Sequence, residues 1–172
     1  LAAAAELLAE GGPAALTMEA VAKRARAGKA TLYRWWPSRG RLMLAVYAAS
    51  KSGFGTPDTG RLRDDLIAYV GQMLEHWRAA PQGRVLRHLI AEAQADPDVM
   101  AALTEMRNER WQQIRDLFRR AAARGELAPG VEIDAAEERI AAQAWYWLLT
   151  DQLPGPAALP GRIDQLMRGF TA

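Results

Sequence analysis

The chain has 172 residues, half of them hydrophobic, which is enough to bury about 70% of its unfolded surface in a folded core. It contains no cysteine, which excludes disulfides and thiolate metal sites, and no apolar run approaches the ~20 residues of a membrane span. The overall net charge is only +2. Residues 17–41 nevertheless hold seven lysines and arginines against one glutamate, whereas residues 53–172 have a net charge of −3.

The residue pattern predicts an all-helical chain of about nine helices, because runs of alternating β-branched residues are absent. The first helix is expected over residues 1–10, ending at Gly11-Gly12-Pro13. Its inward face should consist of Leu1, Ala4, Ala5 and Leu8. We expect no signal peptide, because residues 1–9 lack a basic segment.

Two short helices joined by a tight turn are predicted over residues 17–36. Thr17 can cap the first through its hydroxyl, and an apolar stripe follows at Met18, Val21, Ala22 and Ala25. Gly28 is expected to relieve the backbone of the turn. The second helix, from Lys29 to about Trp36, should bury Leu32 and Trp36. Two helices with a short turn that contains glycine are typical of a helix-turn-helix motif.

The rest of the chain follows from start and stop signals. A helix is expected over residues 39–52 and a loop over 53–60, and helices follow over 61–79 and 82–95. A long helix should run from Asp96-Pro97 to Arg124, and a capping box at Asp134 and Glu137 should open the next one. The last helix should start near Pro156 or Pro160. We expect a DNA-binding domain over 1–52 and a ligand-binding and dimerisation domain over 53–172.

The run from Leu16 to Leu42, and above all Gly28-Lys-Ala-Thr-Leu-Tyr-Arg-Trp-Trp-Pro-Ser-Arg39, resembles the DNA-binding domain of TetR-type transcriptional regulators. The usual pattern there is Ser-Lys-Gly/Ala-Thr-Leu/Ile-Tyr-x-x-Phe/Trp-Pro-Ser-Lys after a small turn. Arg26 stands where the family commonly has glycine, and Gly28 where it commonly has a capping serine. Beyond about residue 60 the helical layout is similar to the ligand-binding half of the family. The resemblance implies a bacterial, cytoplasmic regulator.

The basic helix-turn-helix predicts binding to double-stranded DNA; the alternative is a solvated face of ordinary charges. Lys29, Thr31 and Arg34 are candidates for contacts to base edges in the groove. Thr17 and Arg39, at helix N-termini, should bind phosphate, with Arg26 as a further phosphate contact. The resemblance implies that Tyr33 and Trp35 position the helix through phosphate and sugar. Trp35 can alternatively shield the hinge to the following helix.

Residues 140–149 are apolar nearly all the way round a helix, so that helix must be covered on more than one side. A second subunit can supply this cover; the alternative is the central helix of a monomer. The resemblance implies a homodimer that pairs through its last two helices as a four-helix bundle. A two-fold dimer would place two recognition helices ~34 Å apart on a palindromic operator.

The resemblance also implies a repressor that a small molecule releases from DNA by entering the C-terminal helices. An aromatic lining with methionine and a few polar groups suits a hydrophobic or aromatic effector. The same residues at helical spacing can equally be plain core, and His88 can be a surface histidine. The candidate lining residues are Met73, Trp77, His88, Glu92, Met106, Arg110, Trp111, Trp145 and Tyr146.

We do not expect an enzyme. With two histidines and no cysteine, the chain shows no metal-ligand spacing, no nucleophile motif and no glycine-rich phosphate loop. We therefore expect no catalytic residue, metal or cofactor, and no membrane partner. Two other classes stay open: a helical adaptor that binds protein without DNA and, less favoured, a small helical enzyme. Salt-dependent binding to a DNA duplex separates these classes from a regulator.

Overall fold

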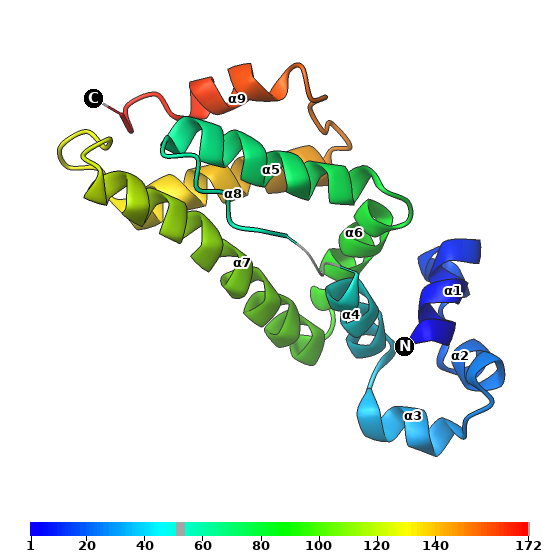
Figure 1. The fold of residues 1–172 in the computed structure, drawn as a ribbon. Helices are drawn as coiled ribbons and strands as arrows, with labels where there is room; N and C mark the ends of the chain where they lie inside the picture. Colours follow the sequence, from blue (N-terminus) through cyan, green and yellow to red (C-terminus); the bar gives the residue numbers. More distant parts are fainter. Residues whose placement is uncertain (51–53, 172) are drawn as a thin grey trace. The chain divides into compact units, whose positions relative to one another are not determined.

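The computed structural model describes residues 1–50 and 54–171, and within these ranges the chain folds into nine α-helices, one 3₁₀ turn and no strand (Figure 1). The all-helical prediction is therefore confirmed. The elements are α1 (Ala2–Gly11), η1 (Pro13–Ala15), α2 (Met18–Ala25), α3 (Lys29–Trp35), α4 (Arg39–Ala49), α5 (Leu62–Arg78), α6 (Gln82–Ala93), α7 (Pro97–Ala123), α8 (Ile133–Leu149) and α9 (Leu159–Leu166). Residues 51 and 52, the predicted end of the fourth helix, lie outside the described residues, as does Gly53 of the predicted loop.

The chain divides into two compact units whose boundary does not follow the predicted division at residue 52. The first unit contains Leu1–Ser52 together with His76–Met106, and the second contains Gly53–Glu75 together with Arg107–Ala172. In the first unit α4 packs mainly on α6, and α6 also contacts η1. The helix-turn-helix therefore shares its core with residues that the sequence assigned to the ligand-binding half. The functional division at residue 52 stays a prediction.

The inward face of α1 differs from the expected one. Leu1 and Ala5 are exposed, and Leu7 is buried beside Ala4 and Leu8. The helix begins at Ala2, and its buried stripe follows positions 4, 7 and 8, the spacing of one helical face. In α2 the buried residues are Met18, Val21 and Ala22, whereas Ala25, at the last turn, is exposed.

The start of α7 confirms one predicted cap, and the start of α8 corrects another. Asp96 Oδ1 accepts hydrogen bonds from the N–H groups of Asp98, at 2.9 Å, and Val99, at 3.3 Å. In α8 the N-cap is Glu132, which makes no side-chain cap bond, and Asp134 already lies inside the helix. The predicted capping box is therefore wrong, because Glu137 is buried and its carboxylate lies 3.5 Å from Arg115 on α7.

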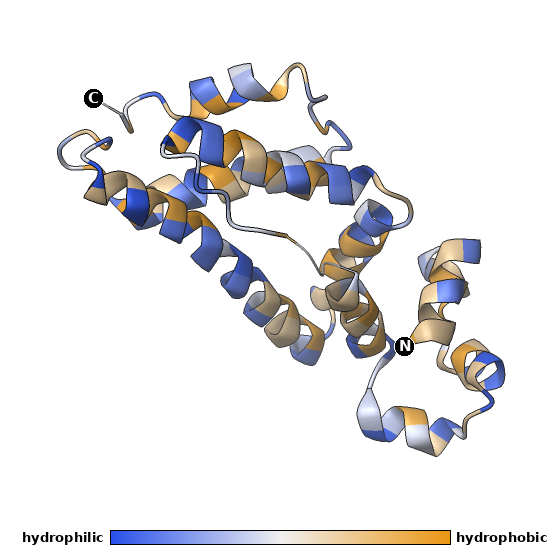
Figure 2. Cartoon of the chain, in the orientation of Figure 1, coloured by the Kyte–Doolittle hydropathy of each residue, from blue (hydrophilic) through white to orange (hydrophobic). Residues whose placement is uncertain are grey.

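The second unit contains most of α5, the C-terminal part of α7, and all of α8 and α9, and its buried side chains are aliphatic and aromatic. Figure 2 colours α5 and α7 in alternating blue and orange, as amphipathic helices require. Phe118 meets Phe170 edge to face at 5.7 Å, and the Ala128 N–H donates to the Phe170 carbonyl at 2.9 Å. Arg139 of α8 donates to the Leu166 and Arg168 carbonyls, both at 3.2 Å, so the segment after α9 is held from two sides. No helix in the described part of the chain combines the length and apolar character needed to cross a membrane.

Candidate DNA-binding surface

The first helix of the motif, α2, begins with a side-chain cap. Thr17 has extended backbone angles, and its hydroxyl accepts a hydrogen bond from the Ala20 N–H at 3.0 Å. This bond satisfies one of the free donors of the first turn, so it fixes where α2 starts. The predicted cap is confirmed; the phosphate contact assigned to Thr17 stays a prediction.

The turn between α2 and α3 is built on Arg26 rather than on Gly28. Arg26 has φ 51° and ψ 40°, the left-handed conformation, and its N–H donates to the carbonyls of Ala22 and Lys23. Gly28 has φ −68° and ψ 142°, which any residue can adopt, and it caps α3 without a side chain. The prediction that Gly28 relieves the turn is therefore wrong. The family's usual glycine at position 26 could have indicated the left-handed residue of the turn, because glycine adopts this conformation without strain.

Helix α3 is anchored by one side chain and exposes the rest. Leu32 is only 6% exposed, whereas the other residues of the helix, Lys29 to Trp35, are exposed. Trp35 is 68% exposed and Tyr33 46%, so two large aromatic side chains share this surface with Lys29, Thr31 and Arg34. Trp36, expected to be buried with Leu32, is half-buried. The structure thus brings the predicted base-contacting residues together on one outward-facing helix.

The two cations of this face have different surroundings. Lys29 Nζ lies 2.8 Å from Glu19 Oε1, and both side chains are more than half exposed. This hydrogen bond raises the pKa of Lys29 and lowers the pKa of Glu19. An exposed pair of this kind is weak in water, so Lys29 can exchange the carboxylate for a phosphate or a base. Arg34 meets no ion-pair or hydrogen-bond partner among residues 1–50 and 54–171.

Arg39, predicted to bind phosphate, instead uses its guanidinium to hold the protein together. Its Nε donates to the Leu16 carbonyl and one terminal nitrogen to the Pro13 carbonyl, both at 2.7 Å. The other terminal nitrogen donates to Glu92 of α6 at 2.9 Å. The Arg39 and Glu92 side chains are 29% and 23% exposed. Arg39 therefore ties the start of α4 to the segment before α2 and to α6.

Two residues predicted to line the effector pocket, His88 and Glu92, lie beside the Arg39 guanidinium. His88 Nε2 is 3.4 Å from an Arg39 nitrogen. Next to Arg39 in the chain, a Cβ on Gly40 would lie 2.5 Å from Val99 and 3.0 Å from the Glu92 carboxylate. Only a glycine allows α4 to approach α6 and the start of α7 this closely. Sequence reasoning missed the junction, although a glycine inside the apolar pattern of α4 was a signal for it.

The other seven predicted pocket residues are divided between the two units. In the first unit Trp77 is buried and donates to the Tyr47 hydroxyl at 3.0 Å, and Met106 is half-buried. In the second, Met73 is buried, Trp145 is half-buried and Tyr146 is exposed. The effector pocket stays a prediction.

Arg110 and Trp111, also in the second unit, take part in contacts within α7 and with its neighbours. The guanidinium of Arg110 lies over the Phe54 ring at 4.6 Å, and that of Arg107 over Trp111 at 4.2 Å. The Tyr69 hydroxyl donates to the Arg110 carbonyl at 3.2 Å, and burial raises the pKa of Tyr69 to about 12. The sequence did not point to Phe54, Tyr69 or Arg107 as lining residues, although they contact the two predicted residues.

Comparison with family models covers both halves of the chain. Residues 1–46 match "Bacterial regulatory proteins, tetR family", and residues 56–166 match "Tetracyclin repressor-like, C-terminal domain". The match to the C-terminal model alone spans more than half of the chain.

Curated relatives are regulators with a helix-turn-helix. The uncharacterized HTH-type transcriptional regulator YdeS of Bacillus subtilis is 28% identical over 151 residues, which are 87% of this chain and 76% of YdeS. The uncharacterized HTH-type transcriptional regulator Rv1556 of Mycobacterium tuberculosis is 34% identical over 124 residues, 71% of this chain and 60% of that protein. A DNA-binding transcriptional repressor TetR of Mycobacteroides abscessus is 37% identical over 83 residues, 47% of this chain and 44% of that protein.

Solved structures show the same fold. The TetR family transcription regulator SCO0332 superposes with a TM-score of 0.79 at 30% identity, over 99% of this chain and 95% of that chain. A TetR transcriptional regulator from Agrobacterium tumefaciens gives a TM-score of 0.71 at 22% identity, over 99% of this chain and 92% of its own. At 22% identity, the similarity to the A. tumefaciens regulator supports the fold alone.

Proposed function

This chain belongs to the TetR family of bacterial regulatory proteins, and from that premise we propose that it represses transcription by binding a palindromic operator as a homodimer. The observation that carries the proposal is α3, a helix with one buried residue and an outward face of basic, hydroxyl and aromatic side chains. Such a helix fits a major groove, whose floor presents acceptors and methyl groups. The similar repressor of M. abscessus supports repression rather than activation.

On this surface we assign base readout to Lys29, Thr31 and Arg34, which share an exposed helix. Lysine and arginine donate to the O6 and N7 acceptors of guanine, and the threonine methyl fits a thymine methyl. Tyr33 and Trp35 contact sugar and phosphate. Thr17 and Arg26 contact phosphate at the two ends of α2. Arg39 takes the role of an anchor for the motif rather than of a phosphate ligand, because its donors are already bound.

The homodimer is supported by the surface of α8. Tyr146 and Leu149 are 53% and 50% exposed, and Trp145 beside them is half-buried. A second copy of α8 and α9 would cover Tyr146 and Leu149 in a four-helix bundle. Pairing also gives the operator its two half-sites, one turn of DNA apart.

For regulation we propose that a small hydrophobic or aromatic molecule binds among the helices that follow α4 and lowers the affinity for the operator. Such an effect requires that the effector bind the two states with different affinities. We place the protein in the bacterial cytoplasm, where its operator is.

Selection of bound fragments from random duplex DNA tests the proposal. The purified protein should enrich an inverted repeat, and binding to it should weaken steeply as salt rises, because phosphate contacts release counterions. Arg34→Ala should bind more weakly and relax the preference at one base position of each half-site, whereas Arg119→Ala, at an exposed arginine of α7, should leave binding unchanged. The absence of any enriched sequence, with binding to a protein instead, would support the adaptor alternative. Enrichment of a single half-site would argue against the dimer.

A further inference from the structure

A groove of about 730 Å³ with many charged lining residues lies wholly within the second unit, where the start of α5, the end of α7 and the segment after α9 meet. Its charged lining residues are four arginines and two acids: Arg61, Arg63, Arg124, Arg168, Glu126 and Asp164. A volume of this size accommodates a small ligand. The groove has no part in the DNA-binding surface described above.

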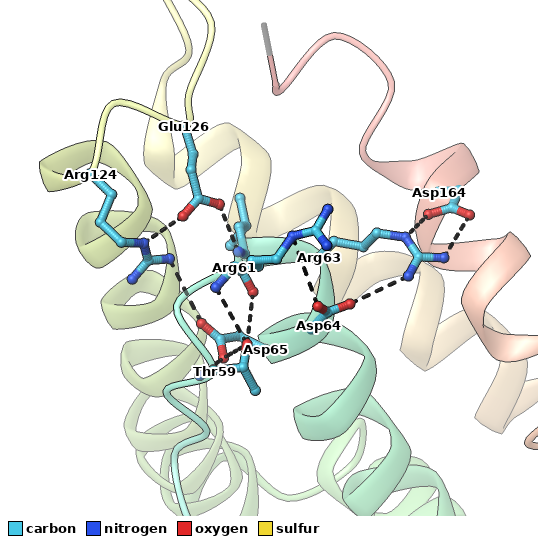
Figure 3. A network of polar contacts seen from close by, with 9 residues as sticks. Thr59, Arg61, Arg63, Asp64, Asp65, Arg124, Glu126 and Asp164 are labelled. Carbon is cyan, nitrogen blue, oxygen red and sulfur yellow. Dashed lines mark hydrogen bonds and ion pairs between the residues drawn. The ribbon is translucent and has the colours of Figure 1, made fainter.

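Both acids of the lining are neutralised by arginines of the same lining. Arg63 binds Asp164 through two hydrogen bonds, Nε to Oδ1 at 2.6 Å and a terminal nitrogen to Oδ2 at 3.0 Å. Arg124 donates to one oxygen of Glu126, and the other oxygen accepts from the Leu62 N–H at 2.7 Å. Figure 3 shows the two pairs on either side of Arg61. These four residues together bring no net charge to the groove.

The two remaining arginines are not neutralised in this way. Arg61 is 74% exposed, and its nearest carboxylate, on Asp64, lies 4.0 Å away. The guanidinium of Arg168 meets no polar partner among residues 54–171. Asp64 and Asp65 of the same network do not line the groove. Asp65 is fully buried and accepts from the N–H and hydroxyl of Thr59.

We propose that this groove binds a small anion with two or more phosphate or carboxylate groups, held by Arg61 and Arg168. Guanidinium groups bind such oxygens in pairs of parallel hydrogen bonds. The rim is open at Gly60 and Gly125, where an added Cβ would meet no atom within 4 Å. The exposed Arg63–Asp164 pair can turn toward the ligand at small cost, because surface ion pairs are weak. The anion would then join the start of α5 to the end of α9.

Isothermal titration of the full chain with tripolyphosphate and, separately, with citrate tests this inference at ~0.15 M salt, where nonspecific attraction is screened. The variant is Arg61→Gln with Arg168→Gln. The matched control, Arg119→Gln with Arg162→Gln, removes two exposed arginines of the same unit that do not line the groove. Circular dichroism melting of both variants checks that they remain folded.

We expect binding of at least one anion, weakened at least about tenfold in the groove variant and by less than about twofold in the control. The anion that binds identifies phosphate or carboxylate as the recognised group. No heat of binding for either anion, or equal weakening in both variants, overturns the inference. The titration contains no DNA, so its failure is distinct from a failure of the operator selection.

Discussion

Arg34 and Arg39 lie five residues apart in one basic run, yet the structure gives them opposite surroundings. Arg34 stands on an exposed helix without an ion-pair or hydrogen-bond partner in the described chain. Arg39 donates to two carbonyls and a carboxylate and is mostly buried. A run of positive charge therefore has two parts, one free for DNA and one that holds the motif in place. The local sequence cannot separate them, because the acceptors of Arg39 lie on other elements.

The largest expected effect is on stability. Arg39→Ala should lower the free energy of unfolding by about 2–3 kcal/mol, because it leaves Glu92 and two carbonyls without their donor in a largely buried place. Urea denaturation followed by circular dichroism measures the change. The stability of Arg39→Lys should lie between that of the parent and that of Arg39→Ala, because one ammonium cannot reach three acceptors. Arg34→Ala, the matched control, should change stability by less than about 0.5 kcal/mol. A stable Arg39→Ala protein with weakened DNA binding would restore the phosphate role to Arg39.

The next effect concerns DNA affinity. Arg34→Ala should weaken binding to the selected operator by about 1–3 kcal/mol and relax the preference at one base position in each half-site. Fluorescence anisotropy with the operator and with single-base variants of it measures both quantities. Uniform weakening on all sequences would show instead that Arg34 contacts only phosphate.

A smaller effect is expected at the turn. Arg26→Gly should raise the free energy of unfolding by about 0.5–1 kcal/mol, because glycine adopts φ 51° without the strain of a side chain. Arg26→Ala keeps the strain and should bring no such gain. Thermal melting compares the two variants with the parent. If Arg26 also contacts phosphate, both variants should bind the operator less tightly.

The smallest effect is expected at the exposed ion pair. Glu19→Gln frees Lys29 and removes a negative charge beside the DNA, so operator affinity should rise by about two- to threefold at low salt. The gain should shrink as salt rises, because exposed charges are screened. Anisotropy at two salt concentrations tests this. Unchanged affinity at low salt would mean that Lys29 does not reach the DNA.

The helices and the outward face of α3 could be predicted from the sequence because caps, breakers and periodicity are local. Thr17 and Asp96 mark their helices without help from the rest of the chain. The turn at Arg26 was misplaced because Gly28 offered the more obvious explanation. The start of α8 was misplaced because Glu137 could either close a capping box at Asp134 or pair with a distant arginine. The structure pairs it with Arg115, and the burial that favours this pair is a tertiary property.

The polar junctions could not be predicted, because each joins distant segments. Arg39 meets Glu92 across 53 positions, and Arg63 meets Asp164 across 101. Any of the many acids and arginines could have formed such pairs. The same holds for Gly40, whose need for space depends on Val99.

The exposure of Trp35 has a practical consequence. Of the six tryptophans, Trp35 is the most exposed, at 68%, whereas three are half-buried and two are buried. Acrylamide should therefore quench Trp35 more strongly than any other single indole, and Trp35 lies at the end of the helix that we assign to the DNA major groove. Intrinsic tryptophan fluorescence can therefore be used to follow DNA binding at this surface without an attached dye.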